Sequence, residues 1–231
     1  MKSSIVVRSY ASADACLVAF VDTLKTALTA PADRPQGIMI SGGSTPLAAY
    51  RQLIADPVAA DPSIRLFFAD DRHVAHDSPD ANFHHVKPMA DALGIADEHL
   101  LRVRDDLNLD VATEAYGDDL DAFFTADGVI PIGFLGMGAD GHTASLFTLE
   151  DADRLDCTTL AVRDHGGFNR VSVSSAVLAR VRRLIFIVTG EGKVEMMRNL
   201  LQQPETIPAG HAVDGHPAVE LWTDVAIAKL G

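Results

Sequence analysis

Short runs of β-branched and other apolar residues alternate along this chain with longer stretches of helical periodicity. The expected strands cover residues 5–8, 38–40, 64–68, 100–103, 132–135, 160–162, 184–188 and 219–222. Expected helices fill the gaps, and they include residues 111–124, 175–181 and 193–201. This alternation is typical of an α/β protein with a mainly parallel sheet. Right-handed crossovers would then bring the loops after the strands to one edge, where such sheets bind ligands.

Length and composition favour one folded unit. No low-complexity linker or internal repeat interrupts the 231 residues, and 48% of them are hydrophobic, so we predict a single domain over residues 1–231. A charged fraction of 22% excludes a disordered chain. No apolar run is long enough to cross a bilayer, and Lys2 with a three-residue apolar run at 5–7 is far short of a secretory signal. We therefore expect a cytoplasmic protein.

The net charge of −13 limits the partners of the chain. Nucleic acids and anionic membranes need a basic surface, so neither is expected to bind. A small phosphorylated molecule is not excluded, because charges act on a site mainly within about one Debye length, roughly 8 Å at physiological salt. We expect such a small molecule as the partner. A monomer and a dimer are equally compatible with the sequence.

The loop at residues 136–147 joins a glycine-rich turn to an acid and an imidazole. It follows the apolar run 130–135, and residues 144–147 can begin a helix, so we expect it where a strand passes into a helix. Glycines alone would indicate only a turn, but they do not explain why Asp140 and His142 stand in it. We predict His142 as a catalytic base, with Asp140 orienting the ring.

The same loop also matches the dinucleotide fingerprint GxGxxG through Gly136, Gly138 and Gly141. In a dinucleotide site the pyrophosphate lies against bare backbone at a helix start. Here Asp140 would place a carboxylate beside that anion. We therefore expect no nucleotide cofactor.

A second loop with small side chains follows the expected strand at 38–40. Gly42, Gly43, Ser44 and Thr45 supply backbone N–H groups and two hydroxyls just before a helix with Pro46 in its first turn. This arrangement predicts a cradle for a phosphate or a sugar. The alternative is an ordinary capping turn with Ser44 or Thr45 as the N-cap.

Three cations stand near expected strand ends. Arg72 follows the strand at 64–68, and its guanidinium can bind a phosphate or polarise a carbonyl, although Asp70 and Asp71 beside it could instead hold it in an ion pair. Lys193 lies at a helix start, where the helix dipole disfavours a cation, so a ligand role is favoured over a solvated lysine. Arg170 supplies a further cation.

Histidines at positions 73, 76, 84 and 85 raise the question of a metal. Zinc needs three or four converging ligands, and this spacing matches no standard pattern. We expect exposed or helix-face histidines and no metal.

Four segments together resemble the 6-phosphogluconolactonases, which hydrolyse 6-phospho-D-glucono-1,5-lactone in the oxidative pentose phosphate pathway. These segments are residues 41–46, Asp70-Asp71-Arg72 with Asn82, residues 136–147, and Arg170 with residues 190–193. They span most of the chain in the order of the family. The resemblance implies a single Rossmann-like three-layer α/β/α domain with no cofactor. It also implies that Arg170 and Lys193 bind the phosphate and that Arg72 faces the substrate.

The chain departs from the usual family pattern at several positions. Asp71 replaces the glutamate of an Asp-Glu-Arg motif, which puts a direct role for this carboxylate in doubt. Ala75 and Ala81 replace a proline and a serine, and Thr148 stands where proline is common.

The implied mechanism is water attack on the C1 carbonyl with His142 as the base, and with backbone N–H groups or Arg72 at the developing oxyanion. A serine nucleophile at Ser145 is a competing chemistry, although no G-x-S-x-G motif surrounds it. Two other functions compete. Glucosamine-6-phosphate deaminase/isomerases have similar loops, but they carry Asp-Glu-Tyr in place of Asp70-Asp71-Arg72 and continue Asp-Gly-His with Ile-Ala-Phe-Asn-Glu. A non-catalytic sugar-phosphate sensor would use the same cradle.

Overall fold

The computed structural model describes residues 5–231, so the first four residues of the domain expected over 1–231, including Lys2, lie outside the described residues. Within the described chain, seven strands form a parallel sheet in the order β1-β10-β9-β6-β2-β3-β5. The bounds are β1 Val6–Ser9, β2 Gln36–Ile40, β3 Ile64–Phe68, β5 Leu100–Leu101, β6 Val129–Leu135, β9 Leu184–Ile187 and β10 Val219–Thr223. The predicted α/β class with a mainly parallel sheet is confirmed.

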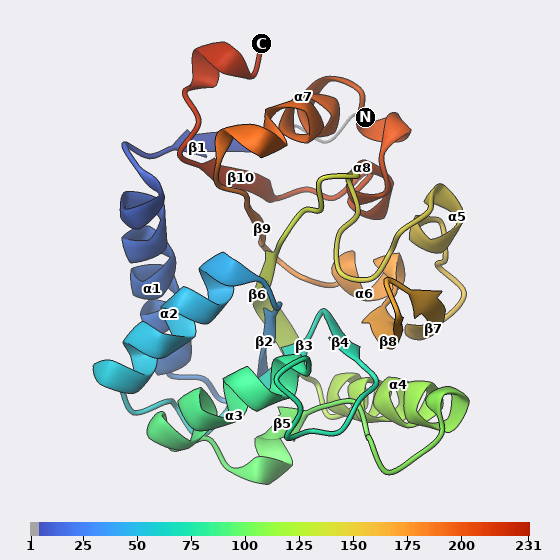
Figure 1. Cartoon of the computed structure of the whole chain (residues 1–231). Coiled ribbons are helices and arrows are strands. Elements are labelled where there is room, and N and C mark those ends of the chain that lie inside the picture. The colour runs from blue at the N-terminus through green and yellow to red at the C-terminus, as the bar shows by residue number, and fades with distance from the viewer. Residues whose placement is uncertain (1–4) are drawn as a thin grey trace.

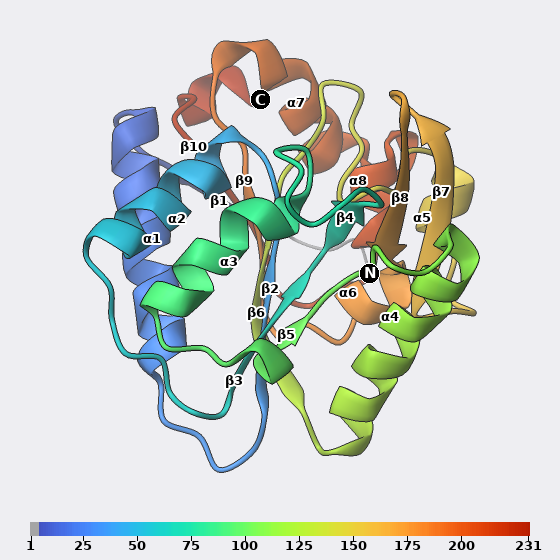
Figure 2. The ribbon, with the colours of Figure 1, turned by 60° about the horizontal axis from the view of Figure 1, so that its bottom comes forward.

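Helices cover both faces of this sheet (Figures 1 and 2). The helices on one face are α1 (Ala13–Thr29), α2 (Ser44–Ala55) and α3 (Asn82–Ala92). The other face carries α4 (Leu109–Thr125), α6 (Ser175–Leu178), α7 (Val194–Gln202) and α8 (Pro208–Ala212). Each layer buries its own hydrophobic core against the sheet, which gives the three layers that the resemblance implies.

The first helix shows how local sequence sets an element. Ser12 is its N-cap, and its Oγ accepts a hydrogen bond from Ala15 N–H at 3.1 Å. Residues at helical spacing, including Phe20 and Leu24, are fully buried on the face that meets the sheet. Capping and periodicity therefore agree on the start and the orientation of this helix.

The strand order reverses direction at β2. From β2 the chain passes to β3 on one side, and later to β6 on the other. At such a switch point the loops after neighbouring strands diverge and leave a crevice at the carboxyl edge. The loops after β2 and β6 begin at Ser41 and Gly136, so the two glycine-rich segments identified in the sequence flank that crevice.

A second sheet of the described chain is antiparallel, in the order β4-β8-β7. Its strands are β4 (Asp70–Arg72), β7 (Thr159–His165) and β8 (Phe168–Val173). The strand expected at 160–162 therefore pairs in a hairpin and does not join the parallel sheet. This sheet places Arg72 directly opposite Arg170.

Three predicted helices differ from the structure. Residues 144–147 do not begin a helix, because Ala144 has a positive φ of 49° that no α-helix contains. The helix begins instead as α5 (Leu149–Ala152), where Thr148 and Asp151 form a capping box. The helix expected at 175–181 is limited to α6 (Ser175–Leu178), and the helix expected from 193 begins at Val194 after the 3-10 turn Glu191–Lys193. Within the described residues, no helix combines the length and apolarity required to span a membrane.

Candidate active site

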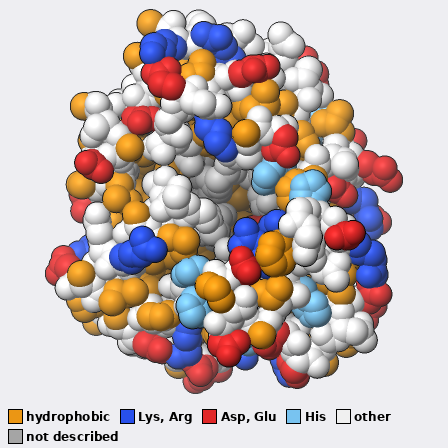
Figure 3. Space-filling model, in the orientation of Figure 1, with side chains coloured by type: hydrophobic (Ala, Val, Ile, Leu, Met, Phe, Trp, Pro, Cys, Tyr) orange, Lys and Arg blue, Asp and Glu red, His pale blue; other side chains and the backbone are white. Residues whose placement is uncertain are grey.

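A cavity of about 520 Å³ opens at the carboxyl edge of the parallel sheet. Figure 3 shows it as a hollow near the middle of that face, with lysine, arginine and histidine side chains beside it. Its size suits a small molecule. The lining residues come from the loops after β2 and β6, from the starts of α2 and α3, and from β4 and β8, and they include Gly42, Gly43, Ser44, Asp70, Arg72, Asn82, His85, Gly138, His142 and Arg170.

His142 and Asp140 form a hydrogen-bonded pair at the wall of this cavity. The distance from His142 Nδ1 to Asp140 Oδ1 is 2.5 Å, and the same oxygen accepts the backbone N–H of His142 at 3.3 Å. Burial raises the pKa of the Asp140 carboxyl, but the hydrogen bond and charge of His142 outweigh burial and lower it below its ordinary value. An ionised Asp140 can only accept, so it holds the proton on Nδ1 and leaves Nε2 as the basic nitrogen.

Glycine is required beside this pair. A Cβ at Gly138 would lie 2.1 Å from His142 Nδ1 and 2.3 Å from Asp140 Oδ1, which is closer than any real contact. The loop is closed around the pair because Gly138 N–H donates to the His142 carbonyl at 2.8 Å. The glycine spacing that resembles a dinucleotide fingerprint therefore makes room for a side-chain pair.

The start of α2 forms one wall of the cavity. Its N-cap is Gly43, with φ 107°, and no side chain caps the helix, so neither Ser44 nor Thr45 is the N-cap considered from the sequence. The first-turn N–H groups therefore remain available to an anion. Gly42 lets Asn82 approach closely, because a Cβ at that position would lie 2.1 Å from Asn82 Oδ1. Thr45 is directed elsewhere, with its Oγ1 3.4 Å from Thr189 Oγ1.

Arg72 and Arg170 lie side by side across β4 and β8, and both line the cavity. Two like charges opposite each other destabilise a strand pair, and here the Asp70 carboxylate attracts both of them. The Phe168 ring lies 5.0 Å from the Arg72 guanidinium and 5.9 Å from that of Arg170. The Nε atoms of both arginines are buried without a hydrogen-bond partner among the described residues. The two guanidinium groups both line the cavity, so together they can present positive charge to an anion there.

Lys193 approaches the site from behind the loop after β6. Its Nζ donates to the Met137 carbonyl at 2.7 Å, and Met137 itself lines the cavity. Lys193 is not one of the lining residues of the cavity formed by the described chain. The Lys193 ammonium group is therefore near the cavity, and the loop after β6 uses one of its three N–H donors.

Asp70 is a cavity residue that the sequence-based site did not include. It is 8% exposed, and its Oδ2 accepts a hydrogen bond from Ser145 Oγ at 2.5 Å. Burial raises the pKa of Asp70, while the Ser145 hydrogen bond and the charges of Arg170 and His142 oppose the rise. Ser145 N–H in turn donates to Ser172 Oγ at 3.2 Å. This network ties the loop after β6 to β4 and β8.

Asp71 has a structural role. Its Oδ1 accepts the N–H groups of Arg72 and Asn82, and its Oδ2 accepts that of Phe83. The last two are the first N–H groups of α3, so Asp71 caps this helix from a neighbouring strand. Burial raises the pKa of Asp71 to about 7 against the effect of these N–H donors. The Asp71 carboxylate therefore acts as a helix cap. It holds the backbone of Asn82, and Asn82 in turn lines the cavity.

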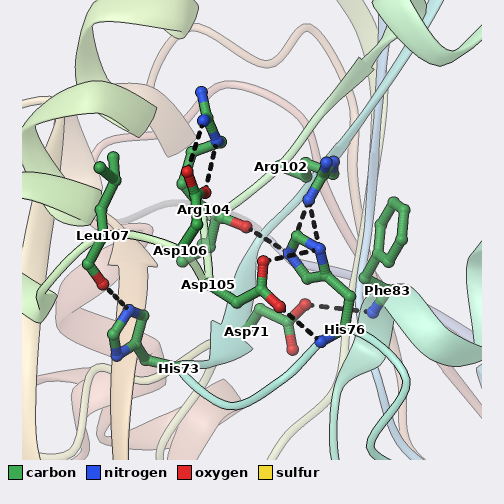
Figure 4. Close-up of polar contacts among 10 residues, drawn as sticks. Asp71, His73, His76, Phe83, Arg102, Arg104, Asp105, Asp106 and Leu107 are labelled. Atoms are coloured by element: carbon green, nitrogen blue, oxygen red, sulfur yellow. Dashed lines mark hydrogen bonds and ion pairs between the residues drawn. The ribbon is translucent and has the colours of Figure 1, made fainter.

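Three of the four histidines considered as metal ligands contact backbone carbonyls, and the fourth, His84, lies edge-to-face against the His85 ring. His73 and His76 contact the Leu107 and Val103 carbonyls through Nε2, and His85 contacts that of Pro79. Figure 4 shows His76 between Arg102 and Asp105. Within residues 5–231, no group of three or more His, Cys, Asp or Glu side chains is placed to hold a metal ion.

Comparison with known proteins places this arrangement in context. A family model described as glucosamine-6-phosphate isomerases/6-phosphogluconolactonase matches residues 9–222. The chain is 30% identical over 206 residues to a 6-phosphogluconolactonase from Aggregatibacter actinomycetemcomitans, which covers 86% of the chain and 88% of the relative. It is 29% identical over 204 residues to the human 6-phosphogluconolactonase, with 83% and 79% covered.

Solved structures share the fold at lower identity. A 6-phosphogluconolactonase from Thermotoga maritima has a TM-score of 0.80 and 23% identity, covering 96% of this chain and all of its own. A monomeric glucosamine-6-phosphate deaminase has a TM-score of 0.78 and 17% identity, covering 98% of this chain. Because one fold carries both activities, structural likeness alone does not choose between them.

Proposed function

Because the chain belongs to the glucosamine-6-phosphate isomerase and 6-phosphogluconolactonase family, we propose that His142 is the general base of a lactone hydrolase. The reaction is hydrolysis of 6-phospho-D-glucono-1,5-lactone to 6-phospho-D-gluconate, a step of the oxidative pentose phosphate pathway, and it is the activity that the relatives' name states. One observation carries the role of His142. His142, with its 2.5 Å contact to Asp140, lines the same cavity as the uncapped start of α2 and two arginines.

The reacting end of the substrate lies at His142. Nε2 takes a proton from water as the water oxygen attacks C1, and Asp140 stabilises the imidazolium that forms. The tetrahedral intermediate collapses as the bond from C1 to the ring oxygen breaks. His142 returns the proton to that oxygen, so the base is regenerated. Charge on the carbonyl oxygen is met by Arg72 or by backbone N–H groups of the glycine-rich loop after β6.

The phosphate binds at the start of α2, next to the paired arginines. Backbone N–H groups at Gly42, Gly43, Ser44 and Thr45 form the cradle, and Arg170 supplies a guanidinium. Lys193 adds positive charge from behind Met137. The support for this assignment is the absence of a side-chain cap on α2 and the position of Arg170 on the cavity wall in the described structure.

Two alternatives are disfavoured by particular contacts. Ser145 is fully buried and its hydroxyl is bound to Asp70, which leaves it unsuited to attack a substrate carbon. The deaminase reaction moves a proton between C1 and C2, and the related enzymes place a carboxylate at the position of Phe147. Here the Phe147 ring lies 4.4 Å from the His142 ring, so an apolar surface replaces that acid.

The test is hydrolysis of freshly prepared 6-phosphogluconolactone, with the spontaneous rate subtracted. We expect rapid turnover by the wild type and a loss of about 100-fold or more in kcat for His142→Ala, with little change in KM. Ammonia release from glucosamine 6-phosphate, measured in parallel, should be absent. Ammonia release without lactone turnover would reject the proposed reaction, and a near-normal kcat in the variant would reject His142 as the base.

A further inference from the structure

The segment that carries His142 is held at its start by α8. The backbone N–H of Ala209, in the first turn of α8, donates to the Gly141 carbonyl at 2.9 Å. Gly141 has φ +84°, and a Cβ there would lie 2.9 Å from Ile207 at the start of that helix. The backbone immediately before His142 is therefore packed directly on α8.

The same segment is held at its end by α5. Phe147 N–H donates to Asp151 Oδ2 at 3.2 Å, and the capping box of Thr148 fixes the entry into the helix. The Phe147 ring contacts the His142 ring at 4.4 Å. Two short helices thus contact the two ends of the segment that carries the imidazole. Figure 1 shows α5 and α8 side by side, next to the loop after β6.

An ion pair joins the two helices. His211 of α8 places Nδ1 2.9 Å from Asp153 Oδ1, at the end of α5. Its Nε2 lies 2.8 Å from the Glu205 carbonyl oxygen. An ionised carboxylate and a carbonyl can only accept, so both contacts are hydrogen bonds only when both ring nitrogens carry protons. The geometry therefore selects the imidazolium form of His211.

We propose that the His211–Asp153 pair is a positioning device for His142, complete while His211 is protonated and weakened when His211 loses its proton. His211 is a positioning residue that acts through Ala209 and Gly141. It touches neither the cavity wall nor the reacting atoms. The effect on catalysis rests on the proposed function, whereas the link between His211 and Gly141 does not.

The surrounding charges determine the direction of the pH dependence. The hydrogen bond to Asp153 raises the pKa of His211, burial opposes the rise, and the Glu205 carbonyl and the charges of Asp153 and Asp214 add to it. The His211 side chain is 25% exposed on a second cavity of about 320 Å³, so solvent protons reach it. A raised pKa means that the pair contributes fully below the ordinary histidine pKa of about 6.5 and is lost as pH rises through the folded value.

The pair is tested by the pH profile of kcat. We compare the wild type with His211→Gln and Asp153→Asn from about pH 5 to about pH 9, the range in which histidines titrate. Asp156→Asn is the matched control, because it removes the exposed pair with Arg154 by the same change of side chain. We expect the wild type to lose kcat on the alkaline side. At pH values below this alkaline decrease, His211→Gln and Asp153→Asn should have a kcat about 3- to 30-fold lower than the wild type and a KM within about twofold of it. Neither variant should show the alkaline decrease in kcat, and the control should match the wild type.

The ring nitrogens and backbone amides are followed by NMR during the same titration. In the wild type the amide signals of Gly141 and His142 should move with the protonation of His211, and in Asp153→Asn His211 should titrate at lower pH. Three results would overturn the proposal. They are pH profiles of kcat that are unchanged in both variants, a loss of kcat in the control equal to that in the variants, and Gly141 amide signals that do not change as His211 titrates. If the wild type shows no lactone turnover, the proposed function fails, and the NMR result alone decides the positioning link.

Discussion

Replacing Gly138 with alanine is a sharp perturbation of the catalytic pair, because it adds one methyl group at a known place. That methyl would lie 2.1 Å from His142 Nδ1 and 2.3 Å from Asp140 Oδ1. To reach an ordinary contact of 3.4 Å the imidazole must move by about 1.3 Å, which breaks its hydrogen bond to the carboxylate. A displacement of about 1 Å at a reacting group costs roughly 100-fold in rate. We therefore expect kcat to fall at least that far.

The assay is initial-rate hydrolysis of fresh lactone, together with a thermal melt. KM and Tm should change little, because the displaced atoms are the ends of partly exposed side chains. Gly192→Ala is the control, since a Cβ there meets no atom within 4 Å. The double variant with Asp140→Asn should lose less than the two single losses combined, because both changes break one interaction. A kcat within about threefold of the wild type for Gly138→Ala would refute this reasoning.

Three further results are expected. Arg170→Lys should raise KM for the lactone about tenfold with kcat nearly unchanged, because lysine cannot bind a phosphate in bidentate fashion; an unchanged KM would remove this arginine from the phosphate site. Burial raises the pKa of Glu220, but hydrogen bonds, first from Arg183, lower it more strongly, to about 2. Glu220 therefore stabilises the fold at pH values above its ordinary pKa of 4.5, and this contribution is lost as the pH falls towards 2. Glu220→Gln should therefore cost about 1–3 kcal/mol of unfolding free energy near neutral pH and lose less Tm than the wild type on acidification; parallel melting curves against pH would contradict this. Ser145→Ala should keep kcat within about tenfold, because its hydroxyl binds Asp70, and trapping of an acyl-enzyme by hydroxylamine would contradict that role.

The parts of the fold that depend on local pattern were predictable. The apolar runs identified the parallel strands. Asp140 lies only two residues before His142, so both side chains could be expected at the same end of one loop. Because parallel strands share a carboxyl edge, loops about 90 residues apart in sequence could be expected to meet there. The expected phosphate cradle also follows β2 at that edge, although its helix is capped by Gly43.

The second sheet was missed although the sequence contains its signal. Gly166 and Gly167 have positive φ and connect two strands through a two-residue turn, which is a strong hairpin pattern. This hairpin pattern predicts that residues 159–165 pair with residues 168–173. The third strand, Asp70–Arg72, is only three residues long and has no periodicity to detect, so the pairing of Arg72 with Arg170 could not be foreseen.

Long-range packing decided the remaining errors. Residues 144–147 have helical propensity, but buried contacts of Ser145 with Asp70 and β8 hold this segment in a tight turn, and packing overrides propensity there. Asp71 caps a helix that begins eleven residues later, so its role depends on tertiary structure. His211 meets Asp153 across 58 residues, and no local pattern joins them.

The most direct test of the account is a crystal structure with 6-phospho-D-gluconate bound. We expect the C1 carboxylate to lie within about 3.5 Å of His142 Nε2 and the phosphate to accept hydrogen bonds from the first turn of α2 and from Arg170. A phosphate beside His142, or a sugar acid bound away from both groups, would contradict the assignment of the two ends of the cavity.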